Sequence, residues 1–513
     1  MKAHLLYADR DFDVDATLPP HHGDLEQDLD LGTLLGAMAN GDKFIFDVSR
    51  KVLLASLGNP EEIRYRQQVL LDCMSHPDVI REMYALVVTA LSDKRAFFSY
   101  RSSSPHLILH GAVQQLGAFV VRLRQLRKIA DDHAAEFSSL GMRTFFRIIE
   151  TDLDDGYFAT LDAHLDQLHF RSGELMSARL DRDNSGIDYV LHAPRAGRAR
   201  WKERLGLGPR TSYTFSVHPR DEAGSQELSD ITSRGLNLVA NAAAQAADHI
   251  ESYFMMLRAE LAFYVGCLNL HDLLVEKALP TTLPEPSTPE PFGLVCSGLC
   301  DVSLALQLAG HVVGNDVEAD GTPLVIITGA NSGGKSTFLR SVGTAQLMMQ
   351  CGMFVVADSF RASVSTGVFT HFIREEDATM RSGRLDEELR RMDALATQLS
   401  SHCLVLFNES FAATNEREGS EIGRQVVHAL LEAHVRIFFV THQFDLADSF
   451  KRESASSTLF LRAERGPDGR RSYKLVVADP LPTSYGADVY RRIGGWLNER
   501  DEDAPAPRET ARA

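Results

Sequence analysis

The strongest chemical pattern in the sequence is a glycine-rich stretch, PLVIITGANSGGKSTFLRSVGTAQLM, at residues 323–348. Gly329, Gly334, Lys335 and Ser336 fit the spacing GxxxxGK[ST]. In this pattern backbone N–H groups surround phosphates, the lysine reaches the β- and γ-phosphates, and the hydroxyl ligates Mg²⁺. An apolar strand before the loop and a helix after it supply the expected context, so we predict a site for ATP and Mg²⁺. The residues expected to bind the nucleotide are Gly329, Ala330, Asn331, Ser332, Gly333, Gly334, Lys335, Ser336 and Thr337.

Two further apolar runs end in polar residues that suit the same chemistry. HCLVLFNES and RIFFVTHQFDLA read as buried parallel strands, whose C-terminal ends should lie beside the loop. Glu409 would then orient the attacking water, and Asn408 with Ser336 would hold Mg²⁺. His442 would sense the γ-phosphate, although a histidine considered alone is more often structural. Asn408 stands where such strands usually end in aspartate, and a neutral amide binds Mg²⁺ more weakly, so we expect slow hydrolysis.

Composition limits the class of protein. The 513 residues suggest three or four domains, and contents of 44% hydrophobic and 24% charged residues are ordinary for a soluble chain. No apolar run approaches the roughly 18 residues of a membrane helix, and the first residues do not resemble a signal peptide. The six cysteines predict a reduced, cytoplasmic protein, with Cys296 and Cys300 favoured as buried thiols over a metal site. A net charge of −17 opposes general attraction to nucleic acid but leaves room for a local basic groove.

The elements needed to position the site are expected in two parts, a mostly helical half and an α/β half. Five prolines within residues 279–293 mark a boundary between them. We expect a helical core-like region over 1–130, a helical and β segment over 131–227, a long lever-like helix over 228–279, a proline-rich linker over 280–292, an ATPase domain over 293–498 and a disordered tail over 499–513. The lever region has apolar residues at three- and four-residue steps, and its alternative is two helices broken near Gly235.

A basic loop lies between two strand-like segments of the helical half. Its cations face only Glu203, with Trp201 among them, so it is a candidate to contact DNA phosphates; a solvated basic loop is an equal alternative. The candidate DNA contacts are Arg195, Arg198, Arg200, Lys202, Arg204 and Arg210.

The order of motifs resembles the MutS family of mismatch-repair ATPases, a branch related to ABC-type ATPases. TGANSGGKST resembles the family's P-loop with Ala330 for proline and Ser332 for methionine, and HVVGNDVEADG is similar to the stretch before that loop, with Asn315 on the usual asparagine. THQFDLA resembles the family's histidine loop, and YKLVVADPLPTSYGADVYRRIGG its closing strand and the helix start at residues 484–486. The resemblance implies a multidomain fold, with a helical core and lever region followed by an α/β P-loop (ABC-type) ATPase domain.

The sequence departs from the family pattern at two further places besides Asn408. We find no aromatic-x-glutamate wedge in an N-terminal mixed domain, so the chain resembles a short, divergent member without the mismatch-recognition domain. In RSGRLDEELRRMDALATQL, Leu385 and Asp386 replace expected hydroxyl residues. The resemblance implies that this segment approaches the nucleotide of the opposite protomer, through Ser382 or Arg384; an ordinary surface helix is the alternative.

Two hypotheses follow. The first is a homodimeric MutS-like ATPase whose ATP binding and slow, DNA-dependent hydrolysis drive clamping of DNA in repair or recombination, together with a downstream repair protein. The second is a nucleotide-gated dimeric scaffold with little hydrolysis and no direct DNA binding. A transporter motor is a weak third reading, because the LSGGQ-type signature is missing.

Overall fold

The computed structural model describes residues 2–97, 104–170, 173–183, 186–192, 216–218, 220–308, 310–374, 383–454, 457–466 and 470–482. The chain divides into two compact units. The first unit comprises Met1–Phe12 with Asp72–Tyr264, and the second comprises Asp13–Leu71 with Val265–Ala513. The expected helical region 1–130 is therefore shared between the two units, since residues 13–71 pack with the C-terminal half of the chain.

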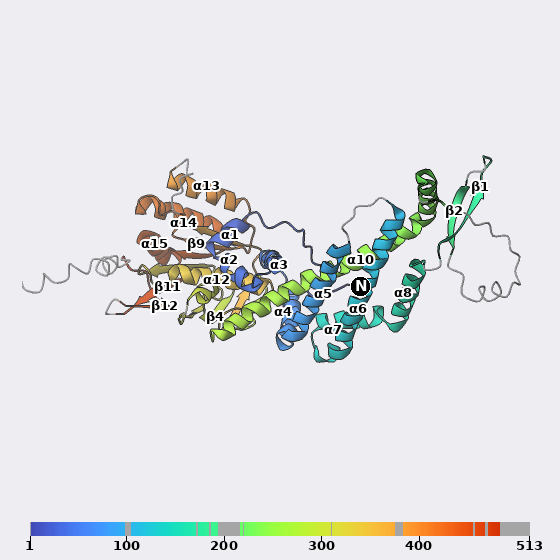
Figure 1. Ribbon diagram of the computed structural model, residues 1–513. Helices are drawn as coiled ribbons and strands as arrows, with labels where there is room; N and C mark the ends of the chain where they lie inside the picture. The colour runs from blue at the N-terminus through green and yellow to red at the C-terminus, as the bar shows by residue number, and fades with distance from the viewer. Residues whose placement is uncertain are drawn as a thin grey trace, which may run out of the picture. The chain divides into compact units, whose positions relative to one another are not determined.

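The first unit is built on helices, most of them labelled in Figure 1. Its helices are α5 (Pro77–Phe97), α6 (Pro105–His133), η1 (Ala134–Glu136), α7 (Leu140–Asp152), α8 (Asp155–Leu168) and most of α10 (Glu222–Glu276). A hairpin of β1 (Leu175–Leu180) and β2 (Gly186–His192) completes it. Phe119, Phe145, Phe146 and Phe254 are fully buried in its core. No helix in the described parts of the chain has an apolar stretch long enough to cross a membrane.

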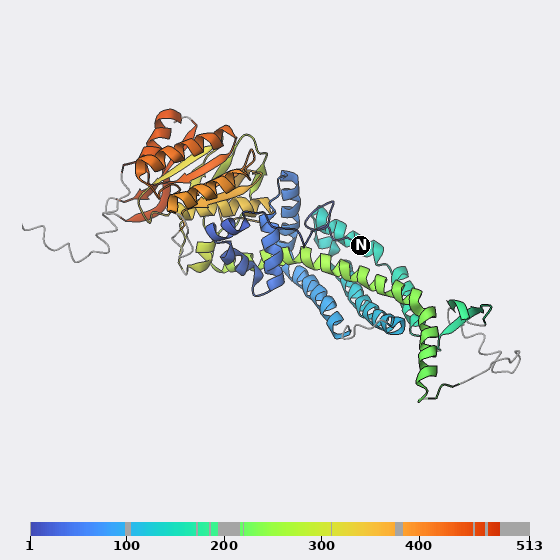
Figure 2. The same cartoon turned by 90° about the horizontal axis from the view of Figure 1, so that it is seen from above.

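Helix α10 is one uninterrupted element of 55 residues, seen along its length in Figure 2. At 1.5 Å per residue it is about 80 Å long, and it contributes residues to both units. The helix continues without interruption through Gly235, where the sequence analysis kept two separate helices as an alternative. A Cβ at Gly235 would lie 2.1 Å from the sulfur of Met176, so the glycine allows strand β1 to approach the helix closely.

A buried carboxylate on α10 anchors the N-terminal segment of the first unit. Glu260 is fully buried and its Oε2 accepts the backbone N–H of Leu5 at 2.5 Å, while the Tyr264 hydroxyl donates to the Leu5 carbonyl at 2.6 Å. Burial raises the pKa of Glu260 to about 7, although the N–H groups of Leu5, Leu6 and Phe12 act in the opposite direction.

The second unit is an α/β assembly of two sheets and their helices. Its helices are α1 (His22–Asp28), α2 (Leu31–Ala39), α3 (Lys43–Leu54), most of α4 (Pro60–Ser75), α11 (Val302–Gln307), α12 (Lys335–Gln350), α13 (Arg384–Ala396), α14 (Glu416–Glu432) and α15 (Phe444–Ser454). The larger sheet has the strands β6 (Leu324–Gly329), β8 (Val368–Phe372), β9 (Leu404–Asn408), β10 (Arg436–Val440), β11 (Thr458–Arg465) and β12 (Arg471–Val477).

The larger sheet has the order β12-β11-β6-β10-β9-β8, and all neighbouring pairs are parallel except β11 with β12. Side chains alternate between its faces. Val405 and Phe407 of β9 pack into a cluster with apolar residues of α13, α14 and α15, whereas Leu406 faces Gly343 of α12. Figure 1 accordingly shows α12 on one side of the sheet and α13 to α15 on the other. Fully buried parallel strands explain the continuous apolar runs in the sequence.

The smaller sheet has the order β3-β7-β4-β5, with β3 (Glu285–Ser287), β4 (Leu294–Leu299), β5 (Asn315–Glu318) and β7 (Ser359–Ser363). Strand β3 lies inside the stretch expected to be a proline-rich linker and pairs in parallel with β7. That stretch is therefore partly ordered as an edge strand, a place where proline is tolerated because it need not donate to a neighbour.

Candidate functional site

The glycine-rich loop connects β6 to the N-terminus of α12, as the sequence predicted from its apolar flanks. Gly329 and Gly334 have φ angles of 107° and 90°, in the region that favours glycine. A Cβ at Gly329 would lie 2.9 Å from the backbone nitrogen of Ala463, so a side chain would not fit there. The first turn of a helix leaves backbone N–H groups without partners in the helix, and these suit an anion.

Lys335 begins α12 and is buried beneath the loop. Its Nζ donates to the carbonyl oxygens of Gly329 and Ala330, at 3.2 and 3.1 Å. Burial lowers the pKa of Lys335 to about 8; the charge of Glu409 acts against this shift and the charge of Arg471 adds to it. A buried ammonium that is bonded only to neutral carbonyls is suited to gain an anionic partner.

Ser336 and Asn408 meet at the C-terminal edge of the sheet. Ser336 is exposed, and its hydroxyl donates to Asn408 Oδ1 at 2.9 Å. A hydroxyl and an amide carbonyl offer two oxygen ligands side by side, the donor type that Mg²⁺ prefers. The structure therefore brings together the two residues that the sequence assigned to the metal.

Glu409 and His442 form a hydrogen-bonded pair beside the loop, with His442 Nε2 2.8 Å from Glu409 Oε1. Burial alone would raise the pKa of Glu409, but the hydrogen bond and charge of His442 and the charge of Lys335 lower it below the usual value. Glu409 is consequently ionised at neutral pH and able to accept a proton or orient a water molecule.

The chain turns sharply after β9. Glu409 and Phe411 have φ angles of 57° and 63°, which are unusual for residues other than glycine. Gln443 Nε2 donates to the Phe411 carbonyl at 3.0 Å. Gly419 of α14 packs against the same carbonyl, because a Cβ there would lie 2.2 Å from the oxygen. Contacts from α14 and from the segment after β10 thus fix the conformation of this turn.

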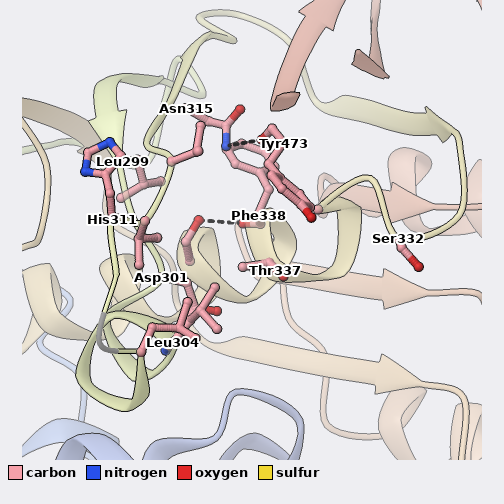
Figure 3. A pocket seen from close by; sticks show the side chains of 14 residues that line it. Leu299, Asp301, Leu304, His311, Asn315, Ser332, Thr337, Phe338 and Tyr473 are labelled. Atoms are coloured by element: carbon pink, nitrogen blue, oxygen red, sulfur yellow. Dashed lines mark hydrogen bonds between the residues drawn. The ribbon is translucent and has the colours of Figure 1, made fainter. Parts of the chain in front are cut away.

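A pocket of about 380 Å³ opens beside the loop (Figure 3). Ser332, Gly334 and Phe338 line it from the loop and α12, and Tyr473 lines it from β12. Asn315 also lines the pocket, but its amide is occupied: Nδ2 donates to the Tyr473 carbonyl at 3.3 Å, and Oδ1 accepts the Leu475 N–H at 2.7 Å. Asn315 therefore joins β5 to β12 through hydrogen bonds to the backbone. The side chain of Tyr473 is about half exposed and lines the pocket with its ring.

Several predicted residues lie elsewhere or outside the described residues. Arg384 is exposed at the start of α13, while Ser382 and residues 484–486 are not described. The six candidate DNA contacts all fall within residues 193–215, which are also not described. Cys296 and Cys300 are buried free thiols, and no group of potential metal ligands of the His, Cys, Asp or Glu type gathers in the described parts of the chain.

Sequence reasoning missed three residues of the site, namely Gln443, Arg471 and Tyr473. Arg471 Nε donates to the Asn331 carbonyl of the loop at 3.2 Å. Gln443 directly follows His442, so its position in the histidine segment was an available signal. Tyr473 is the first residue of the stretch that resembles the family's closing strand, so that stretch was an available signal. Arg471 lies half-buried on the same antiparallel edge strand, and nothing local in the sequence marks it.

The fold and site together define a multidomain chain of helices and mixed sheets. At one edge of the larger sheet it brings together a glycine-rich loop, the glutamate that follows β9 (Glu409) and a histidine (His442). Two family models match the chain: the MutS2 N-terminal domain over residues 58–277, and MutS domain V over residues 325–495. The chain belongs to the MutS family.

Curated relatives match parts of the chain. The DNA mismatch repair protein MutS of Chloroflexus aurantiacus is 32% identical over 296 residues, which are 54% of this chain and 30% of that protein. The protein of the same name from Thermus aquaticus is 30% identical over 182 residues, 36% of this chain and 22% of the relative. MutS protein homolog 4 of Mus musculus is 23% identical over 242 residues, 46% and 24% of the two chains. This chain therefore spans less than a third of each relative's length.

Proposed function

We propose that this protein binds ATP with Mg²⁺ at residues 329–337 and hydrolyses it slowly, as an ATPase of the P-loop (ABC) type. The observation that carries the proposal is the convergence of three pairs at one sheet edge. These are Lys335 with the loop carbonyls, Ser336 with Asn408, and Glu409 with His442.

The residues present fit a triphosphate and a hard cation. Gly329 and Gly334 give the loop a backbone that no Cβ obstructs, and Lys335 exchanges neutral carbonyl partners for phosphate oxygens. Ser336 and Asn408 would hold Mg²⁺, which neutralises charge on the phosphates when bound. Glu409 orients the attacking water as an ionised carboxylate, and His442 holds that carboxylate in place while facing the γ-phosphate.

The nucleotide base would occupy the pocket beside the loop. The phenol ring of Tyr473 offers a face on which a flat heterocycle stacks, and Phe338 and Leu304 supply apolar contacts. The side-chain amide of Asn315 is hydrogen-bonded to the backbone of β12. In this proposal the base is therefore recognised by shape and stacking more than by that amide.

Coupling to DNA is the wider part of the proposal. Two of the named relatives are DNA mismatch repair proteins, and α10 is long enough to carry a movement over about 80 Å. We propose a homodimer in which Arg384 or Ser382 of one protomer approaches the nucleotide of the other, with the basic residues of 193–215 contacting DNA phosphates. A cytoplasmic location is part of the same proposal.

A dimeric scaffold that binds ATP with little hydrolysis and no DNA is the second candidate. Asn408 favours it, because the neutral amide supports Mg²⁺ less strongly than a carboxylate does. Retention of an ionised Glu409 paired with His442 favours the ATPase.

Steady-state ATPase measurements with and without homoduplex, mismatched and branched DNA test the proposal. We expect slow turnover that one of these DNAs stimulates, and loss of ATP binding in Lys335→Ala. Unchanged turnover in that variant would refute the assigned site. DNA affinity that falls steeply with salt supports the clamp, and no binding at low salt supports the scaffold.

A further inference from the structure

The turn that carries Glu409 is held in a conformation that does not form on its own. Glu409 and Phe411 both lie in the left-handed region, on either side of Ser410. Such conformations cost on the order of 1–3 kcal/mol each unless the surroundings impose them. Gln443 and Gly419 fix the carbonyl of Phe411 from one side, and Ser410 is held by separate contacts.

Ser410 is buried and bonded to a histidine of the neighbouring edge strand. The Ser410 hydroxyl lies 2.7 Å from Nδ1 of His371, in β8, and 2.6 Å from the carbonyl oxygen of the same residue. The imidazole also stacks on Phe411, with ring centroids 5.6 Å apart and 24° between the planes. One side chain therefore contacts both residues that follow Glu409.

The second ring nitrogen of His371, Nε2, points toward helix α13. This nitrogen lies 3.1 Å from the backbone carbonyl of Glu388, and Arg391 of the same helix donates to the Phe372 carbonyl of β8 at 2.9 Å. His371 has no exposed surface, and burial, aided by the charge of Arg391, lowers its pKa to about 4. The imidazole is therefore neutral and carries a single proton near pH 7.

The neutral imidazole of His371 carries one N–H proton but makes hydrogen-bond contacts at both of its ring nitrogens. With the proton on Nε2, His371 donates to the Glu388 carbonyl and accepts from the Ser410 hydroxyl at Nδ1. With the proton on Nδ1, the ring donates to Ser410, which then donates to the His371 carbonyl, and the Glu388 carbonyl faces a lone pair. The bond to α13 and the arrangement around Ser410 are thus linked through one ring.

We propose that His371 is a positioning residue for the hydrolysis: it holds Ser410, and through it the carboxylate of Glu409, in place. The inference rests on the proposed ATPase function. The contact of Nε2 with the Glu388 carbonyl of α13 orients the imidazole for this role. His371 itself touches no reacting atom.

Substitutions at His371 separate its two contacts. In His371→Asn the amide lies where Nδ1 was and keeps the bond to Ser410, whereas in His371→Gln it reaches the Nε2 position and keeps only the contact to Glu388. His371→Phe keeps the ring and loses both. We expect kcat to fall about 10- to 100-fold in the Phe and Gln variants and to be largely retained in Asn. The Kd for ATP should stay within about twofold, because the loop is untouched.

Ser410→Ala provides a second, smaller perturbation. Its kcat should fall as in His371→Phe, and the double variant should fall no further than either single one, since both remove the same contact. The matched control is Ser363→Ala, which removes a buried hydroxyl of the smaller sheet, bonded to the backbone of Gly293. Its kcat should equal that of the unaltered protein.

Hydrogen exchange of residues 408–413 reports on the turn without any need for turnover. The Glu409 N–H is bonded to the Val440 carbonyl at 2.9 Å, and its exchange should accelerate in His371→Phe and Ser410→Ala but not in Ser363→Ala. Wild-type kcat and exchange in His371→Phe would overturn the inference, as would a fall in His371→Asn equal to that in Phe. If the unaltered protein lacks ATPase activity but exchange changes as expected, the proposed function fails and the positioning of the turn stands.

Discussion

Raising the pH from about 7.5 to about 9.5 should weaken ATP binding, because it removes the charge of Lys335 in the nucleotide-free protein. Burial has lowered the pKa of this lysine to about 8. A bound triphosphate keeps the ammonium protonated, so above that pH each binding event must take up a proton. Affinity then falls about tenfold per pH unit, which amounts to roughly 30-fold at about pH 9.5, or about 2 kcal/mol.

Equilibrium titration with ATP at constant Mg²⁺ measures this dependence. The terminal phosphate of ATP is already fully ionised over the range, so its own titration does not contribute. Glu409→Gln supplies a test of sign: the carboxylate raises the pKa of Lys335, so its removal should move the inflection to lower pH. An affinity that is constant over the range, or an inflection that moves upward in Glu409→Gln, would refute the reasoning.

Three further predictions concern other features. Asn408→Asp places a carboxylate against the Ser336 hydroxyl and should lower the Mg²⁺ concentration for half-maximal ATPase activity roughly tenfold; an unchanged Mg²⁺ titration would contradict this. Glu260 has a folded pKa of about 7, above its unfolded value, so the first unit should lose up to about 3 kcal/mol of stability as pH rises from about 4.5 to about 7. Hydrogen exchange of α10 measures this loss, which should be absent in Glu260→Gln. Gly419→Ala gains about 1 kcal/mol of helix propensity but places a Cβ 2.2 Å from the Phe411 carbonyl, so thermal unfolding should occur at lower temperature; a higher midpoint would show that the turn adapts.

The elements around the loop were predictable because their signals are local. A buried parallel strand is a short apolar run, and its C-terminal end marks where polar residues of different strands meet, which is why Lys335, Asn408 and Glu409 could be grouped from the sequence. The long helix was predictable for a similar reason, since its apolar residues recur over many turns.

Other features depend on contacts between distant residues and leave no local mark. Nothing near Phe411 shows that it adopts a glycine-like φ, because that conformation is imposed by Gln443, Gly419 and His371. The occupation of the Asn315 amide by the backbone of β12 is equally invisible, and the resemblance alone directs attention to its side chain. The grouping of residues 13–71 with the C-terminal half also joins segments far apart in sequence.

That discontinuous second unit has a consequence for how the protein is made. Residues 13–71 leave the ribosome early, but the sheet and helix that they pack against are synthesised only after residues 72–264. Leu29, for example, packs beside Gly343 of α12. Until α12 is synthesised, Leu29 and the apolar residues near it in the nascent chain have no packing partner. Exposed apolar surfaces of this kind bind chaperones or aggregate. Slow translation of the middle segment should therefore lower the yield of folded protein, even though that segment belongs to the other unit.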